Sequence, residues 1–386
     1  MLDSGETRQL EIAQDIFRSA FEASHWTSFG GFDFGARSRS YGWEPKTNKE
    51  KLHWYLGFAE LLVPLLDSKN EARVDWAKEL LAKHFLGLWT YAGCFDFLEG
   101  IVRKYGVGGH WPDMWRSIKR TIHYHGKKHT PELLKKIEEL ERLAAPTDPY
   151  SEIEAYALTN TWEHIEVRNG DFRENSNEIH RKIEKLGELA VSEPEYLEKL
   201  APRLWKQHID ALWSFGKGVA KGSSDQRATF DTLVQLMKKQ ELQLIQTNFF
   251  RGFIAGVYAD NPSLSRILQE SVLIVPELKP YFVDILTATP LAPWGTKRLI
   301  ELAQASELEA WRFQQISYGK THELICDDEF SKLLGAINDL ADGIFVTIEI
   351  LSMRFFTDKD SNYSPNNDLR SVGRLAISKL LSMHRD

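Results

Sequence analysis

The stretch DEFSKLLGAINDLADGIFVTIEILSMRFF, residues 328–356, contains two short amphipathic segments in succession. In the first segment apolar residues recur every three or four positions, at Phe330, Leu333, Leu334, Ile337 and Leu340. The second segment repeats this spacing at Ile344, Ile348, Leu351 and Phe355. Apolar residues spaced in this way lie along one face of an α-helix. The stretch therefore predicts two helices that pack against each other as a pair.

The same pairing recurs upstream of this stretch. Four such pairs begin near Gln226, Ser263, Lys297 and Asp328, at intervals of 37, 34 and 31 residues. No segment alternates apolar and polar residues for long enough to predict a sheet. A helix pair that recurs at this interval is typical of α-solenoids, in which each pair buries its apolar face against its neighbours. The sequence predicts an all-α fold, an α-solenoid of HEAT- or TPR-like helical repeats with an irregular N-terminal helical part.

Proline and glycine mark the expected organisation of the chain. Residues 1–145 are expected to form an N-terminal helical region, interrupted by the glycine- and aromatic-rich loop SFGGFDFGARSRSYGWEP at 28–45. The segment AAPTDPY at 144–150 has the composition of a linker and is the best domain boundary in the chain. A helical-repeat region should then cover 151–386. Within it, GKGVAKGSSD at 216–225 is expected to be a loop.

The overall composition limits the possible classes of protein. The net charge of −7 over 386 residues argues against a general nucleic-acid binder. Two cysteines, Cys94 and Cys326, are too few for a disulfide framework and suit a reducing compartment. The beginning MLDSGETRQLE lacks a basic region followed by an apolar run, and no stretch is long and apolar enough to span a membrane. A cytoplasmic protein is the expectation.

A search for catalytic motifs finds none that is complete. Gly319-Lys320-Thr321 supplies the end of a phosphate-binding loop, but Gln314 stands where its first glycine should be. No Gly-x-Ser-x-Gly motif is present, and Cys94 lies in an apolar context that favours a packed core thiol. The sequence therefore predicts no enzymatic activity and no cofactor.

A histidine cluster offers the sharpest alternative to a non-enzymatic protein. The segment HYHGKKH at 123–129 could place His123, His125 and His129 around a zinc ion, with His110 nearby. A catalytic zinc site would usually add a carboxylate at a fixed spacing, as in His-Glu-x-x-His, and none is present. A polar turn between two helices is the simpler interpretation, and a zinc-dependent hydrolase remains the less favoured one.

A second polar feature overlaps this cluster. Residues 116–136 carry a local net charge of +6, from Arg116, Lys119, Arg120, Lys127, Lys128, Lys135 and Lys136 against Glu132. Trp111, Trp115 and Tyr124 lie among these charges. Basic residues with interleaved aromatic rings can bind single-stranded nucleic acid, and they can equally bind an acidic protein. A solvated surface with no partner is the third possibility.

Several stretches resemble the C-terminal helical-repeat, or sensor, region of bacterial STAND-type ATPases associated with antiphage defence. They are FGARSRSYGWEP at 34–45, HFLGLWTYAG at 84–93, LWSFGKGVAKG at 212–222, FFRGFIAGV at 249–257, WRFQQISYG at 311–319 and ILSMRFFTDKDS at 350–361. They span nearly the whole chain, and none of them is catalytic. In such ATPases a nucleotide-binding domain and an effector domain precede the repeats, and neither segment is found in this sequence.

The resemblance implies a recognition or adaptor module that binds a protein partner, either an ATPase or effector subunit or a foreign protein. A nucleic-acid-binding subunit that uses residues 111–136 is the alternative. The residues expected to contact the partner are in the 28–45 loop and in the basic segment, namely Arg37, Arg39, Tyr41, Trp43, Arg116, Lys119, Arg120, Lys127 and Lys128.

Overall fold

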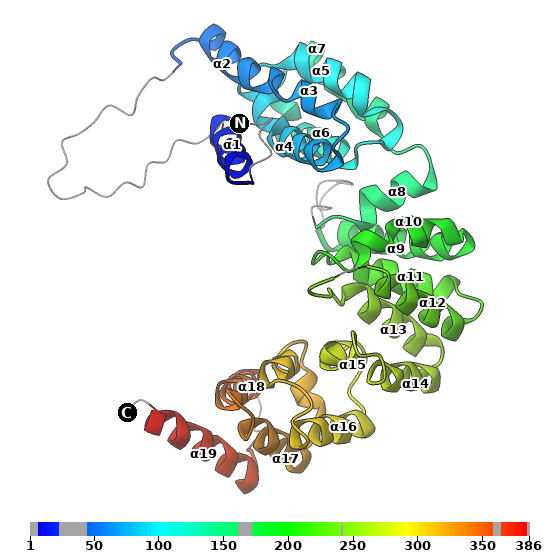
Figure 1. Ribbon diagram of the computed structural model, residues 1–386, viewed down its shortest axis with the longest axis vertical. Coiled ribbons are helices and arrows are strands. Elements are labelled where there is room, and N and C mark those ends of the chain that lie inside the picture. The colour runs from blue at the N-terminus through cyan, green and yellow to red at the C-terminus, as the bar shows by residue number, and fades with distance from the viewer. Residues whose placement is uncertain (1–6, 23–44, 161–171, 241, 358–363, 384–386) are drawn as a thin grey trace, which may run out of the picture. The chain divides into compact units, whose positions relative to one another are not determined.

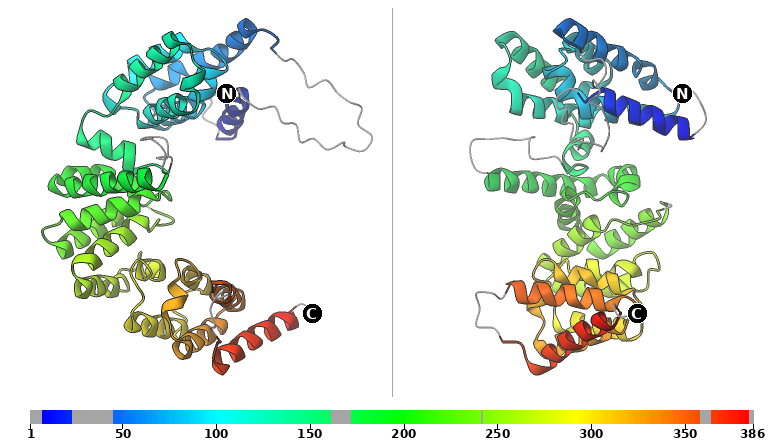
Figure 2. Two further views of the ribbon diagram at one scale, coloured as in Figure 1. Left: turned by 180° about the vertical axis from the view of Figure 1, so that it is seen from behind. Right: turned by 90° about the vertical axis from the view of Figure 1, so that its left-hand side faces the viewer.

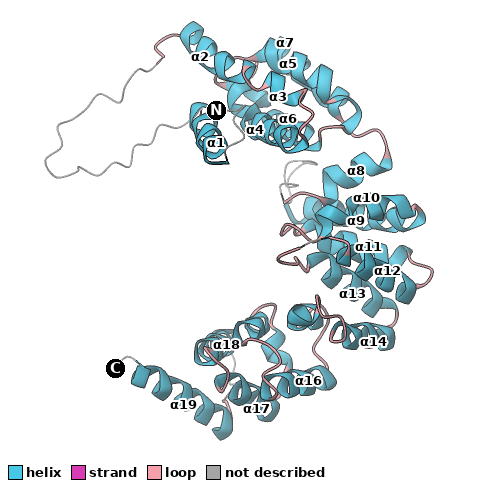
Figure 3. Ribbon diagram, viewed as in Figure 1, coloured by secondary structure: helices cyan, strands magenta, loops and turns pink. Residues whose placement is uncertain are grey.

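In a computed structural model, the described residues, 7–22, 45–160, 172–240, 242–357 and 364–383, form α-helices and short 3₁₀ helices and contain no strand (Figures 1 and 3). The all-α prediction is confirmed. Four of the expected partner-contacting residues, Arg37, Arg39, Tyr41 and Trp43, lie outside the described residues. The chain divides into two compact units, 1–179 and 180–386. No helix in the described ranges combines the length and the apolar character that crossing a membrane requires.

Unit 1 packs around helices α4 and α6. Its α-helices are α1 (Thr7–Ala20), α2 (Asn48–Glu60), α3 (Val63–Leu66), α4 (Glu71–Thr90), α5 (Phe95–Tyr105), α6 (Pro112–His125), α7 (Pro131–Ala144) and α8 (Pro149–Ala157). Two 3₁₀ turns, η1 (Val107–Gly109) and η2 (Gly126–Lys128), follow α5 and α6. The core of the unit includes fully buried side chains of α4 and α6, among them Leu81, Phe85, Leu88, Met114 and Ile118. Burial of such apolar side chains is the main force that holds short helices together.

The segment 144–150, which was predicted to be a linker, lies within unit 1, and its last residues start helix α8. The Asp148 side chain accepts a hydrogen bond from the Ser151 amide, the Ser151 hydroxyl accepts one from the Asp148 amide, and Pro149 occupies the first helical position of α8. This arrangement satisfies amide groups that a helix start leaves unpaired. The new helix contacts α6 and η1. The two compact units divide about thirty residues later than the expected boundary, between Ile179 and His180.

Unit 2 contains helices at the positions of the four predicted pairs. It begins within α9 (Phe172–Ser192) and continues with α10 (Pro194–Leu204), α11 (Ala211–Gly222), α12 (Gln226–Lys238), α13 (Asn248–Asp260), α14 (Pro262–Val272), α15 (Phe282–Leu286), α16 (Pro293–Gln304), α17 (Asp327–Asn338), α18 (Gly343–Thr357) and α19 (Asn367–Met383). The turns η4 (Lys279–Tyr281), η5 (Ala310–Ser317) and η6 (Thr321–Leu324) are 3₁₀ helices. The pairs correspond to α12–α13, α14–α15, α16–η5 and α17–α18, of which the members of α14–α15 and of α17–α18 pack against each other. The second member of the third pair is thus a 3₁₀ helix instead of an α-helix.

The expected loop at 216–225 is instead mostly helix α11, so this prediction is wrong. The glycines that suggested a loop allow α11 to touch the backbones of its neighbours α9 and α13. A Cβ placed on Gly218 would lie 2.7 Å from the Glu184 carbonyl carbon of α9. A Cβ on Gly216 would lie 2.8 Å from the Phe253 nitrogen of α13. Any larger side chain would therefore separate the helices.

The neighbouring helices contribute glycines of their own to this packing. A Cβ on Gly187 of α9 would lie 2.8 Å from the Val219 nitrogen, and one on Gly252 of α13 would lie 2.7 Å from the Trp213 carbonyl carbon. Helices α9, α11 and α13 thus lie directly side by side, α11 in the middle (Figures 1 and 2). Small residues are what permit such close approach of helix backbones. We call this arrangement the glycine-packed trio.

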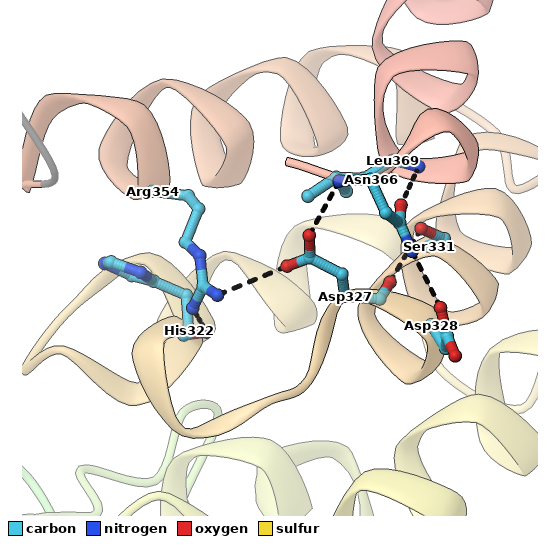
Figure 4. A network of polar contacts seen from close by, with 7 residues as sticks. All are labelled: His322, Asp327, Asp328, Ser331, Arg354, Asn366 and Leu369. Atoms are coloured by element: carbon cyan, nitrogen blue, oxygen red, sulfur yellow. Dashed lines mark hydrogen bonds and ion pairs between the residues drawn. The ribbon is translucent and has the colours of Figure 1, made fainter. Parts of the chain in front are cut away.

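A polar network joins the last helices of unit 2 (Figure 4). The buried Arg354 guanidinium of α18 donates to the His322 carbonyl oxygen and lies 3.4 Å from an Asp327 carboxylate oxygen. The other carboxylate oxygen of Asp327 accepts a hydrogen bond from the Asn366 amide at 2.9 Å. The Asn366 side chain donates to Asp328 at 2.7 Å and accepts from the Leu369 amide at 2.8 Å, which caps the start of α19. One carboxylate therefore connects α17 to α18 and to the beginning of α19.

Candidate protein-binding surface

Helix α6 turns one face into unit 1 and the other toward solvent. Pro112 is at the first helical position, where its missing amide hydrogen costs nothing. Met114, Trp115 and Ile118 are buried, against neighbours that include α4 and α7. The helical period then leaves Arg120 and Tyr124 exposed near the end of the helix. This division decides which of the basic residues can reach a partner.

Arg116 is an interior residue and not a surface contact, which corrects the expectation for this position. Its side chain is only 7% exposed. The guanidinium donates to the carbonyl oxygens of Ala155 at 2.9 Å and Glu154 at 3.3 Å, and it also pairs with Asp113. Glu154 and Ala155 lie in the last turn of α8, whose carbonyl groups have no partner within the helix. The side chain therefore attaches α8 to α6.

Lys119 and Lys136 are also engaged within the unit. The Lys119 ammonium lies 5.1 Å from the centroid of the Trp115 ring and 3.9 Å from a Glu141 carboxylate oxygen. The same oxygen accepts a hydrogen bond from the Trp115 indole at 2.8 Å. Lys136 lies 2.7 Å from carboxylate oxygens of both Asp96 and Glu99. Hydrogen bonds to these two carboxylates, that to Asp96 first, raise the pKa of Lys136.

Four basic side chains of the segment remain exposed. They are Arg120, Lys127, Lys128 and Lys135, which we call the basic surface. Within the described part of the chain none of the four lies within 4.0 Å of a carboxylate oxygen. They come from the end of α6, from η2 and from α7, and η2 contacts α6. Exposed cations that no carboxylate neutralises can attract an acidic partner.

The aromatic residues of the segment do not accompany these charges to the surface. Trp111 and Trp115 are only 2% and 3% exposed, whereas Tyr124 is 49% exposed. Single-stranded nucleic acid is held by stacking of its bases on exposed aromatic rings. Of these three residues, only Tyr124 therefore exposes a ring on which a base could stack.

The three histidines of the expected zinc cluster have different surroundings. The ring of His123 packs against that of Tyr124, with centroids 4.8 Å apart, and the His125 ring meets Tyr91 at 5.7 Å. The His125 Nδ1 and His129 Nε2 atoms are buried and lack hydrogen-bond partners. No three His, Cys, Asp or Glu side chains in the described ranges form a group that could hold a metal ion. The structure therefore gives no geometric support to the zinc hydrolase.

Burial and charge both keep the two inner histidines neutral. Burial is the larger cause that lowers the pKa of His125, and the nearby Lys128 ammonium adds to it. The pKa of His129 is lowered by burial first and then by His125. Desolvation penalises the charged form of a buried imidazole. The charged forms of both side chains are therefore disfavoured, and they add little to the positive charge of the basic surface near pH 7.

The acidic residues that neutralise part of the segment were missed by the sequence analysis. Asp96, Glu99 and Glu141 are 22 to 40 residues away from the lysines that they contact. No local sequence pattern predicts such a pairing.

Comparisons of the chain with protein-family models, with curated proteins and with solved structures gave no match.

Proposed function

We propose that the chain is a non-enzymatic α-solenoid of helix pairs that recognises a protein partner, as a sensor or adaptor in a bacterial antiphage defence system. The partner is an acidic protein surface, either on an ATPase or effector subunit or on a foreign protein. The resemblance to the sensor region of STAND-type ATPases motivates the biological setting. The geometry of the two units supports the repeat architecture and the chemistry of the partner.

A recurring sequence separation supports the solenoid. Several hydrogen bonds made by side chains join residues that are about one helix pair apart in the sequence. The separation is 39 residues for Arg116 and Ala155, 33 for Lys217 and Glu184, 36 for Tyr281 and Ile245, and 35 for Gln314 and Glu349. In a solenoid each repeat contacts only its neighbours, so contacts cluster at one repeat length. Both units show this separation.

One observation carries the choice of partner. The basic surface exposes four cations without carboxylate partners, while the two tryptophans that would make it a platform for bases are buried. Charged patches of this kind accelerate the encounter with an oppositely charged protein and set its orientation. Of the aromatic residues in the segment, Tyr124 alone would be available to stack on a base, together with Tyr91, which is 43% exposed beside His125.

A charge-reversal experiment tests the proposal. Wild-type protein and the triple variant Arg120→Glu, Lys127→Glu, Lys128→Glu are used as affinity baits in lysates of the native host, with and without phage infection. The matched control is Lys49→Glu, Lys69→Glu, Lys83→Glu, which changes the net charge equally at exposed lysines of the same unit. We expect a protein that the wild type and the control retain and that the triple variant loses, with unchanged thermal unfolding of all three.

Equal retention by the triple variant would refute a role for the basic surface. A gel-shift assay with single-stranded DNA and RNA at two ionic strengths examines the alternative. Binding by phosphate contacts weakens steeply with salt. A strong, salt-dependent shift that the triple variant abolishes, together with no retained protein, would favour the nucleic-acid-binding subunit over the adaptor.

A further inference from the structure

Helix α1 is held against unit 1 by a narrow stripe of side chains. Among the described side chains of this segment only Ala13, Phe17 and Phe21, the residue that follows the helix, are buried. They recur every four residues and so lie along one face. Ile12 and Ile16, on a neighbouring face, are 42% and 47% exposed. An element with so few buried side chains opens more easily than the core of the unit does.

The stripe packs on three aromatic side chains of α2 and α4. The Phe17 ring lies edge-on to Phe58 of α2 and to Trp76 of α4, with ring centroids 5.9 Å and 5.7 Å away. The Phe21 ring lies 5.6 Å from that of His84, about two turns further along α4. We call Phe58, Trp76 and His84 the aromatic site. It receives two aromatic side chains that are four residues apart on one helix face.

The contact with α1 leaves part of this site unsatisfied. The His84 Nε2 atom is buried and has no hydrogen-bond partner among the described residues. Trp54, whose ring centroid lies 5.1 Å from that of Phe58, is still 40% exposed. A buried polar atom without a partner lowers the stability of the arrangement that buries it. A helix that also satisfied His84 or covered Trp54 would therefore bind the aromatic site more tightly than α1 does.

The covalent chain allows α1 to leave this position and return. The helix ends at Ala20 and α2 begins at Asn48, so the sequence between them is long enough for α1 to depart without unwinding α2. The ion pair between Asp15 and Arg18 lies within α1 and is kept when the helix departs. Amphipathic helices are recognised through anchor side chains at such i, i+4 positions. A competing helix would thus need two aromatic residues four positions apart.

We propose that α1 occupies, within the chain, a binding site for an amphipathic helix of the protein partner, and that this helix replaces α1 when the partner binds. The inference rests on the proposed function, since the replacing helix belongs to that partner. In the free protein α1 is then an autoinhibitory contact, because it lowers the apparent affinity of the site by the fraction of molecules in which it is bound. The basic surface contains none of the residues involved, so the two contacts can be disrupted separately.

Peptide binding to the full-length protein tests this exchange. The probe is a synthetic peptide of residues 7–22, TRQLEIAQDIFRSAFE, with capped ends and a fluorescent label whose anisotropy is measured. It is titrated with the wild type and with the double variant Phe17→Ser, Phe21→Ser, whose own α1 cannot fill the aromatic site. Two substituted peptides are compared. One carries Phe17→Ala and Phe21→Ala, and the matched control carries Ile12→Ala and Ile16→Ala.

We expect the double variant to bind the peptide in a saturable way. The wild type should reach the same final anisotropy with at least about tenfold weaker apparent affinity, because there the peptide must displace α1. Loss of the two rings from the peptide should weaken binding to the double variant at least about tenfold. Loss of the two isoleucines should leave it within about threefold. Trp76→Ala, added to the double variant, should weaken binding as much as loss of the peptide's rings does.

The folding of each variant is checked by circular dichroism, and Phe17→Ala replaces the double variant if that protein does not fold. A folded variant that binds no peptide, or equal effects of the two substituted peptides, would show that the aromatic site does not recognise the two rings. A wild type that binds no peptide at about a hundred times the concentration that half-saturates the variant would show that α1 is a permanent part of the unit.

These outcomes are distinct from those of the charge-reversal experiment. A partner that is lost on charge reversal, together with no peptide exchange, would refute only the replacement of α1. Peptide exchange in a chain that retains no protein from the lysates would refute the proposed function and leave the exchange of α1 established.

Discussion

The close approach of helices in the glycine-packed trio makes Gly218→Ala an informative substitution. The new methyl carbon would lie 2.7 Å from the Glu184 carbonyl carbon and 2.9 Å from its Cα atom. Carbon atoms in contact prefer a separation of roughly 3.5–4.0 Å, and the Glu184 carbonyl oxygen would lie even closer to the new methyl group, so α9 and α11 would have to move apart by more than about 1 Å. The obstructing atoms belong to the backbone of α9. Removal of the Glu184 side chain would therefore not relieve the clash.

Two opposing effects set the size of the change. Alanine is a better helix former than glycine by about 0.8–1 kcal/mol in a helix interior. Insertion of a methyl group into a well-packed contact costs about 1–3 kcal/mol, and more where the neighbours cannot move. Because both obstructing surfaces are backbone, we expect the upper end of that range and a net loss of about 2 kcal/mol in the free energy of unfolding. For a unit of this size the melting temperature should fall by roughly 4–8 °C.

The matched control is Gly335→Ala in α17 of the same unit, where a Cβ would meet no atom within 4 Å. There only the gain in helix propensity remains, so the protein should become more stable by about 0.5–1 kcal/mol. Urea unfolding followed by circular dichroism measures both variants. A Gly218→Ala protein as stable as the wild type would show that α9 and α11 do not touch through their backbones, and the description of the trio would be wrong.

Three further predictions follow from buried polar groups. Cys326 is exposed and should react with a thiol reagent in the folded protein. Cys94 is buried, and burial raises its pKa to about 12, so it should react only after unfolding. Two thiols that react equally fast in the folded protein would contradict this. Arg116→Met leaves carbonyl groups of α8 without a donor and should lower the free energy of unfolding, measured with urea, by about 2–3 kcal/mol. An unchanged unfolding midpoint would show that Arg116 does not attach α8 to α6. Burial lowers the pKa of His180 below its ordinary 6.5, so the unfolded chain binds the proton more readily and stability is lost as the pH falls below about 6.5. His180→Asn should lose less stability between pH 7 and pH 5 than the wild type, and the same pH dependence in both proteins would show that this histidine is not responsible.

Apolar spacing was sufficient to predict the helices but not every boundary. The apolar spacing of Leu242, Ile245, Phe249, Phe253 and Val257 predicts a helix over 242–257, but α13 begins six residues later, at Asn248. The amides of Ile245 and Gln246 donate to the Tyr281 hydroxyl and the Trp205 carbonyl oxygen instead of entering a helix. Both acceptors are remote in the sequence. Local spacing therefore could not place this boundary.

The glycines of α11 show a second limit. Three glycines within Ala211–Gly222 lower the intrinsic preference for a helix, which is why the sequence predicts a loop there. In the folded chain, contacts with α9 and α13 outweigh that preference. The same sequence would suit a mobile loop if no partner helix were adjacent. Only the tertiary structure decides whether this segment forms a helix or a loop.

The sequence shows which segment carries the excess of basic residues, but it does not show which of these side chains already have partners within the fold. The local excess of positive charge is visible in the sequence, and the exposed positions of Arg120, Lys127 and Lys128 agree with the expectation. Arg116 and Lys119 have partners that tertiary packing supplies, the α8 carbonyl groups and Glu141. Charge patterning counts ionisable residues and does not identify which of them are already neutralised.

The recurring separation of contacts has a consequence for synthesis of the chain. The side-chain hydrogen bonds described above join residues no more than 40 positions apart. A ribosome adds about 5–20 residues per second, so each contact can form roughly two to eight seconds after its first partner is made. The helices can thus assemble in the order of translation, each on the surface of those already folded. The nascent chain need not wait for its C-terminus before it buries its apolar faces, which shortens the period in which they are exposed to aggregation.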